Sequence, residues 1–329
     1  MSTTTEKEVE KVSEALKSMG KLDDNESIKI VSLDDTIKFN CKRCGRCCSN
    51  RDDIILNPYD IYKLAKGLNI TPAEVIKKYC SIHCGVNSCL PVITLKSDER
   101  NLCHFLEFVP SEGKFRCSIN NFKPGACITH PIGTMRAVDK NTGEMTNKQY
   151  IEVPSCSIHG TDVEVKIRDF IKPYLDNETC HDAGNLLMHE ITRYVDSIKV
   201  VKGIANEDAS EEYFTEKEYS ILNEILPDKQ ARKYFANMFY RTYMTTMVSA
   251  AYTEMNTDKG FEEQVNDIKE NIKNNCFKMI AVSNAIGLDI KAKGYEPIPK
   301  DKELLLKITE EMDKDYQKFL EELEGENDD

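Results

Sequence analysis

The sequence has no run of apolar residues long enough to cross a bilayer. A spanning helix needs about 20 such residues, whereas charged residues make up 30% of this chain. The N-terminal residues also lack the positive segment and apolar stretch that mark a secretory signal. These absences predict a cytoplasmic protein with no membrane partner.

Several catalytic signatures are missing as well. There is no Gly-rich phosphate loop, no internal repeat, and no nucleophile–base pair outside the cysteines. His181 and His189 lie eight residues apart, with Glu190 beside them, but this is not a metalloprotease spacing. We therefore interpret these histidines as ordinary core or surface residues.

The charge is unevenly distributed along the chain. The net charge is −12, yet residues 41–136 contain 14 Lys and Arg against 8 Asp and Glu, which leaves −18 for the remainder. No stacking-aromatic motif accompanies this modest basic excess, so we expect no nucleic-acid partner. A positive field does favour the ionised form of nearby thiols, which is the form that binds metal.

What the chain has in abundance is cysteine. There are thirteen, an odd number that does not suit a closed disulfide framework, and a reducing compartment favours metal binding over disulfides. Four of them lie within eight residues, in the segment Cys41-Lys-Arg-Cys44-Gly45-Arg-Cys47-Cys48. Thiols two residues apart can turn toward one centre, and Gly45 can adopt the backbone angles of a tight loop.

Further cysteines extend this cluster to a candidate ligand set of eight. The set is Cys41, Cys44, Cys47, Cys48, Cys103, Cys117, Cys127 and Cys156. Eight thiols suit two four-thiolate sites or one polynuclear centre. The spacing does not distinguish zinc from an iron–sulfur cluster, because both accept four thiolates. Neighbouring side chains point apart, so one of the Cys47–Cys48 doublet could serve a second metal, bridge inside a cluster, or remain a free thiol.

The order of these cysteines resembles the YkgJ-type cysteine-cluster family, a zinc- or iron-chelating group often labelled Fe-S oxidoreductase. The resemblance covers roughly residues 37–160. It is carried by Cys41-x2-Cys44-Gly45-x-Cys47-Cys48, Ile55-Leu56 before an Asp60-bearing helix, Cys103-x-Phe105-Leu106, and Cys117-x-Ile119-x4-Pro124-x2-Cys127-x2-Pro131. It implies metal chelation. A related group contains the flagellin lysine methylase, which makes protein methylation the main enzymatic alternative.

The chain departs from the family pattern at four positions. His104 replaces a proline, Lys123 replaces an arginine, Ile128 stands where an arginine follows the cysteine, and His130 replaces an aromatic residue. Lysine cannot reproduce the planar bidentate donor of arginine, so the resemblance by itself does not predict an anion- or cofactor-binding role here. His104 and His130 are either additional ligands or ordinary hydrogen-bonded histidines.

Another group of donors lies outside the family pattern, in Cys80-x2-His83-Cys84-x4-Cys89. Four donors within ten residues could form a small extra zinc site, or they could be loop thiols. Cys180, His181 and Cys276 are interpreted as core residues.

Hydrophobic periodicity and capping signals predict an α+β fold. Residues 1–36 form an N-terminal extension, 37–160 a small irregular cysteine-rich metal-binding domain with short helices and strands, and 161–329 an all-α region with an acidic tail. Helices start after Asn57 and Thr71. Strands are expected at 91–95, 105–109, 114–116 and 150–153, and helices at 163–173, 181–200, 211–225, 228–254, 261–285 and 302–324.

Three functions are consistent with these patterns. The first is a protein that chelates zinc or an iron–sulfur centre through clustered thiolates, with a helical half that docks to a protein partner. The second is a metal-dependent enzyme, either an Fe-S oxidoreductase or a protein lysine N-methylase. The third is an interaction adaptor whose metal is purely structural.

Overall fold

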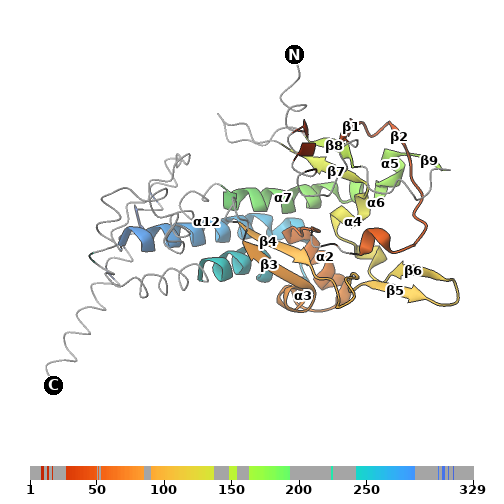
Figure 1. The fold of residues 1–329 in the computed structure, drawn as a ribbon. Coiled ribbons are helices and arrows are strands. Elements are labelled where there is room, and N and C mark those ends of the chain that lie inside the picture. Colours follow the sequence, from red (N-terminus) through yellow and green to blue (C-terminus); the bar gives the residue numbers. More distant parts are fainter. Residues whose placement is uncertain are drawn as a thin grey trace, which may run out of the picture. The chain divides into compact units, whose positions relative to one another are not determined.

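A computed structural model (Figure 1) describes residues 27–49, 51, 53–84, 90–136, 148–153, 163–192 and 242–285, with single positions at 9, 10, 13, 14, 17, 224, 303, 306, 307, 310 and 314. The fold is mixed, with helices and small antiparallel sheets. Among the helices of these ranges, none has the length and apolar character to cross a membrane. The chain divides into two compact units, residues 1–56 with 94–181, and residues 57–93 with 182–329.

Unit 1 is built from short strands. They are β1 (Lys29–Val31), β2 (Thr36–Lys38), β5 (Leu106–Val109), β6 (Lys114–Cys117), β7 (Ile132–Met135), β8 (Gln149–Glu152) and β9 (Glu164–Lys166). β1, β8 and β7 form one antiparallel sheet in that order, β2 pairs with β9, and β5 pairs with β6 as a hairpin. β2 and β9 are therefore neighbours although more than a hundred residues separate them in sequence.

Short helices complete unit 1. They are η1 (Arg46–Cys48), η2 (Asn120–Phe122), α4 (Gly125–Thr129), α5 (Ile167–Phe170) and α6 (Lys172–Leu175). The main apolar cluster joins β2, β7, α5 and α6 through five buried side chains: Ile37, Ile132, Ile167, Ile171 and Tyr174. This core is small, as expected for a unit with such short elements.

Unit 2 is mainly helical. Its elements include α2 (Pro58–Leu68), α3 (Pro72–Tyr79), β3 (Cys80–Cys84), the π-helical turn η4 (Ser249–Thr253) and α12 (Phe261–Ala285). α7 (Glu178–Thr192) and β4 (Pro91–Leu95), which pairs with β3, each cross the boundary between the units along the chain. Within unit 2, Tyr59 and Tyr62 of α2 pack on Phe261, and the Tyr62 hydroxyl donates to the Lys259 carbonyl at 2.7 Å.

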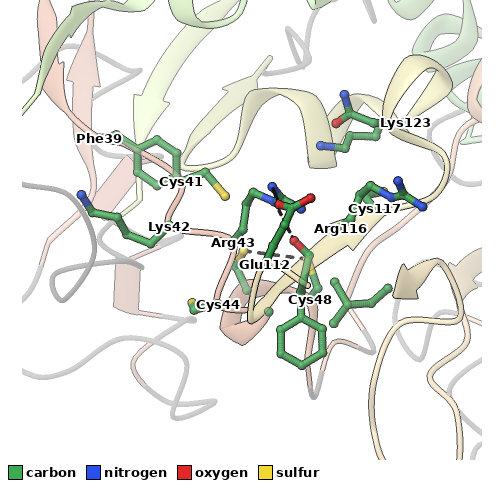
Figure 2. A pocket seen from close by; sticks show the side chains of 15 residues that line it. Phe39, Cys41, Lys42, Arg43, Cys44, Cys48, Glu112, Arg116, Cys117 and Lys123 are labelled. Atoms are coloured by element: carbon green, nitrogen blue, oxygen red, sulfur yellow. Dashed lines mark hydrogen bonds and ion pairs between the residues drawn. The ribbon is translucent and has the colours of Figure 1, made fainter. Parts of the chain in front are cut away.

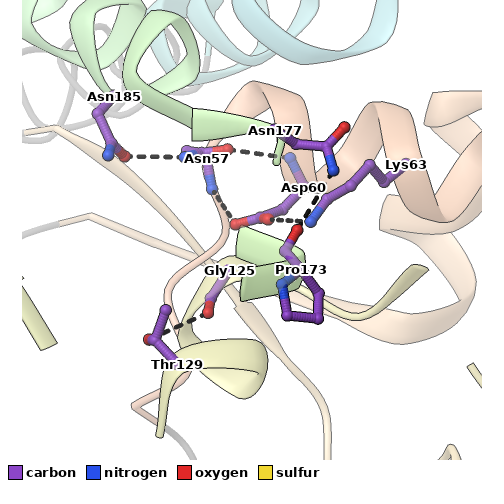
Figure 3. Close-up of polar contacts among 8 residues, drawn as sticks. All are labelled: Asn57, Asp60, Lys63, Gly125, Thr129, Pro173, Asn177 and Asn185. Carbon is purple, nitrogen blue, oxygen red and sulfur yellow. Dashed lines mark hydrogen bonds and ion pairs between the residues drawn. The ribbon is translucent and has the colours of Figure 1, made fainter. Parts of the chain in front are cut away.

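The predicted helix starts after Asn57 and Thr71 are confirmed, because both positions carry complete capping boxes. The Asn57 side chain accepts from the Asp60 backbone N–H and donates to Asn185, as Figure 3 shows. Gly184 packs against the Asn57 side chain. A Cβ on residue 184 would lie 2.8 Å from the Asn57 Oδ1 atom, so the position has no space for a larger residue. Local side-chain to backbone bonds of this kind are readable from sequence.

Most of the other predicted elements within the described residues are also found. Strands 91–95, 105–109, 114–116 and 150–153 correspond to β4, β5, β6 and β8, and helix 261–285 is α12. The helix predicted at 163–173 is wrong at its start, because residues 164–166 form β9 and pair with β2. α7 starts at 178 rather than 181. Residues 193–200 and most of the helices predicted at 211–225, 228–254 and 302–324 lie outside the described residues.

Candidate metal centre

The first cysteine segment folds as a loop that requires its glycine. Gly45 has φ +77° and precedes η1, so it occupies the left-handed region that favours glycine. A Cβ at this position would meet Phe115 at 3.0 Å and Leu106 at 3.1 Å. The Gly45 carbonyl accepts from the Cys48 backbone N–H and from the Ser49 hydroxyl, which closes the turn.

This loop and the β5–β6 hairpin enclose a cavity of about 510 Å³. Five of the eight predicted ligands line it: Cys41, Cys44, Cys47, Cys48 and Cys117. Figure 2 shows the side chains around it, including Cys41, Cys44 and Cys48 from the loop and Cys117 from β6. Cys41 and Cys44 are exposed, whereas Cys47, Cys48 and Cys117 are half-buried.

Two more predicted ligands lie beside Cys48. The Cys103 backbone N–H donates to the Cys48 carbonyl at 2.9 Å, and the charges of Cys103 and Cys127 both raise the pKa of the Cys48 thiol. Cys103 also lies near Cys117, whose charge raises the Cys103 pKa. Five of the eight thiols thus line one cavity, Cys103 and Cys127 lie within electrostatic range of Cys48, and Cys156 lies outside the described residues.

The doublet is electrostatically asymmetric. The sulfur atoms of Cys47 and Cys48 are 4.0 Å apart. The hydrogen bond with the Cys48 thiol, helped by a backbone hydrogen bond and by the Arg51 and Lys123 charges, lowers the pKa of Cys47 to about 6 although burial opposes this. The same hydrogen bond, together with burial, raises the pKa of Cys48. The pair therefore favours a single thiolate, with the lower pKa at Cys47.

Three other titratable groups near the cluster are neutral at neutral pH: Cys103, Cys117 and His130. Burial raises the pKa of both Cys103 and Cys117. Burial, reinforced by the Arg51 charge, lowers the pKa of His130 to about 4, so its imidazole is uncharged. His130 lies edge-on to Phe39 and is half-buried, whereas His104 is exposed.

The cysteines lie close together, but their side chains do not form a coordination shell. In the described part of the chain, no group of three or more His, Cys, Asp or Glu side chains is arranged so that it could hold a metal ion. The chemistry of the donors suits zinc or an iron–sulfur cluster, because both bind thiolates. Binding an ion here would require the side chains of the loop to turn toward one another.

The second predicted group is not gathered in the same way. Cys80 is buried at 3% exposure, whereas His83 on the same strand is exposed. Successive residues of a strand point to opposite faces, so Cys80 and His83 do not share a face of β3. The Cys84 side chain and Cys89 lie outside the described residues. Cys276 is buried as expected, and Cys180 is half-buried.

Sequence reasoning missed the cationic wall of the cavity. Lys42, Arg43, Arg116 and Lys123 line it together with a single carboxylate, Glu112. From the sequence alone, Lys123 is a replacement for arginine with no predicted role in a cavity. The signals available were the basic residues inside the cysteine loop and a lysine between Cys117 and Cys127. Their convergence depends on the hairpin and could not be read locally.

No family model, no curated protein and no solved structure was found to match this chain.

Proposed function

We propose that this protein chelates zinc or an iron–sulfur centre through the clustered thiolates of unit 1. The ligands are drawn from the set Cys41, Cys44, Cys47, Cys48, Cys103, Cys117, Cys127 and Cys156. The resemblance to the YkgJ-type cysteine-cluster family is part of this proposal, as is a reducing, cytoplasmic location.

The observation that supports it best is the convergence of sequence-distant thiols on one cavity. Cys41 and Cys117 are 76 positions apart in the chain, yet both line the same pocket. The Cys103 backbone N–H donates to the Cys48 carbonyl, and Cys127 on α4 lies within electrostatic range of Cys48. Thiols from four separate segments have no need to converge in a reduced protein unless their sulfur chemistry is used.

Binding would organise the loop. The exposed Cys41 and Cys44 side chains are the ones with room to reorient, since η1 and the close approach of Gly45 to Phe115 hold the remainder. Coupling of metal binding to local ordering is common in small metal domains, where binding free energy becomes folding free energy. We propose that the small core of unit 1 is stabilised in this way, with the helical region as a docking element for a protein partner.

The test is elemental analysis and a visible spectrum of protein purified without oxygen. We expect a stoichiometric metal, and the spectrum distinguishes the two candidates. A colourless protein with zinc indicates a thiolate zinc site, whereas a brown protein bleached by dithionite indicates an iron–sulfur cluster. Protein with neither metal after anaerobic purification, and no uptake on reconstitution, would refute the proposal.

The metal content of two cysteine variants tests whether the loop supplies ligands. We expect Cys44→Ser to lower metal content and solubility, because the loop then loses a ligand and its ordering. Cys180→Ser is the matched control, because Cys180 is half-buried in the same unit but does not line the cavity. Equal metal content in both variants would remove Cys44 from the ligand set. The enzyme and adaptor alternatives stay predictions.

A further inference from the structure

The cavity is larger than a metal–thiolate centre requires. Zinc–sulfur bonds are about 2.3 Å long, so an ion occupies only the space between its sulfur ligands. A cavity of about 510 Å³ instead falls within the range that encloses small organic ligands. The cavity therefore has room for a small organic ligand beside the ion.

The walls of the cavity combine apolar and cationic surface. Phe39, Leu106 and Phe115 supply the apolar side, and the stems of the long basic residues add to it. Among its Lys, Arg, Asp and Glu side chains, the lining has four cations and one carboxylate: Lys42, Arg43, Arg116, Lys123 and Glu112. Apolar walls with a cationic rim suit a ligand that has an apolar body and a negative group.

The two arginines are held in place by their own partners. Arg43 donates from Nε to the Phe115 carbonyl at 2.8 Å and forms an ion pair with Glu112. Arg116 forms an ion pair with Glu107, the residue opposite it in the β5–β6 register. These contacts hold the two arginine side chains of the wall in place.

Lys123 is the best placed of the lysines. It lies between η2 and α4, and the following Pro124 restricts its backbone to the extended conformation that it adopts, with φ −53° and ψ 149°. Its side chain is half-buried and lines the cavity. Its charge acts on both Cys47 and Cys117, so the ammonium lies within electrostatic reach of thiols from two elements. A ligand in the cavity would meet this cation next to the sulfur atoms.

We propose that the cavity binds a small organic anion, with an apolar body against Phe39 and Phe115 and a carboxylate, phosphate or sulfonate group at Lys123. This assigns a ligand class to the site described above and so rests on the proposed metal centre for its role. The competing explanation is that the cations only neutralise the thiolates. The two explanations differ in whether an added anion binds.

The experiment uses two fluorescent probes that differ in one group. They are 8-anilinonaphthalene-1-sulfonate and its uncharged counterpart N-phenyl-1-naphthylamine, titrated into the full-length, metal-containing protein. We expect one sulfonate site per chain, with tighter binding than the uncharged probe. Lys123→Gln should weaken sulfonate binding about tenfold, the size expected for loss of one charge-assisted contact. The same variant should leave the uncharged probe unchanged.

Two further variants serve as controls. Lys123→Arg keeps the charge and should retain most of the sulfonate affinity, and its folding is checked by circular dichroism. Lys29→Gln removes an exposed cation of the same unit that does not line the cavity, and it should change neither probe. Equal affinities for both probes, no effect of Lys123→Gln, or several sulfonate molecules per chain would overturn the proposal.

Metal analysis of the same samples separates this inference from the proposed function. If the wild-type protein contains no metal but binds one sulfonate in a Lys123-dependent way, the metal centre fails and the anion site stands. If Lys123→Gln loses metal while sulfonate affinity is unchanged, the cations serve only to neutralise the thiolates, and the anion site fails.

Discussion

At the scale of single residues, the most unusual chemistry lies in the Cys47–Cys48 doublet. Neighbouring side chains usually diverge, but here a 3₁₀ turn brings the two sulfur atoms to 4.0 Å. One thiol then donates to the other, which stabilises a thiolate at Cys47 and keeps the proton on Cys48. Such a pair differs from two independent thiols because the ionisation of one depends on the other.

This asymmetry predicts selective alkylation of the metal-free protein. Because the pKa of Cys47 is lowered to about 6, Cys47 is ionised at pH 7, whereas burial keeps Cys103 and Cys117 protonated. Iodoacetamide should therefore modify Cys47 before Cys103 and Cys117, and the rate should fall as the pH drops through about 6. Peptide mass spectrometry at a series of pH values measures this.

The Cys48→Ala variant provides the control for that measurement. It removes the hydrogen bond that contributes most to the lowered pKa of Cys47, so the midpoint of the alkylation rate should move to higher pH. A midpoint that stays near pH 6 in the variant would show that the backbone hydrogen bond and the Arg51 and Lys123 charges stabilise the thiolate without Cys48.

At the scale of elements, α4 illustrates how a short helix that carries a predicted ligand is positioned. Gly125 opens the helix that contains Cys127, and it lies directly against the ring of His181. His181 is only 1% exposed and stacks on Tyr174 with ring centroids 4.4 Å apart. A residue that sequence analysis assigned to the core therefore supports the helix that brings Cys127 toward Cys48.

We predict that Gly125→Ala destabilises unit 1. The new Cβ would come within 2.9 Å of the His181 Nδ1 atom, and the buried ring has little space into which it can move. Overpacking of this kind costs about 1–3 kcal/mol of unfolding free energy, which urea denaturation measures. The double variant Gly125→Ala/His181→Ala removes the clash, so the glycine substitution should cost less in that background. Equal costs in both backgrounds would contradict the packing explanation.

The elements also show which features sequence could predict. The starts of α2 and α3 depend on side chains three residues apart, so Asn57 and Thr71 were sufficient to predict them. The helix predicted at 163–173 began wrongly, because β9 forms only through pairing with β2 far away in sequence. The first cysteine loop could be predicted for the same reason as the caps, because its turn depends on residues close together in sequence. The cavity and its cations could not be predicted. Arg43 and Lys123 line one cavity only when the chain around the β5–β6 hairpin has folded.

At the scale of the whole molecule, unit 1 is assembled from segments on both sides of residues 57–93. Its main apolar cluster joins Ile37 and Ile132 to three residues beyond position 160: Ile167, Ile171 and Tyr174. Ile167 and Ile171 are fully buried, and β9 in the same stretch pairs with β2. The cysteine loop begins three residues after β2, so this core lies next to it in the chain.

This arrangement predicts that a fragment of residues 37–160 will not fold cooperatively, even though it contains all eight candidate ligands. Each buried side chain contributes about 2 kcal/mol by burial, so losing three removes about 6 kcal/mol from a domain whose total stability is about 5–15 kcal/mol. A fragment of residues 27–181 keeps β1, β9, α5, α6 and His181 and serves as the comparison. Thermal unfolding followed by circular dichroism should show a sharp transition only for the longer fragment, and its metal uptake should exceed that of the shorter one. A sharp transition and full metal uptake by residues 37–160 would instead mean that the thiolate centre alone can hold this unit together.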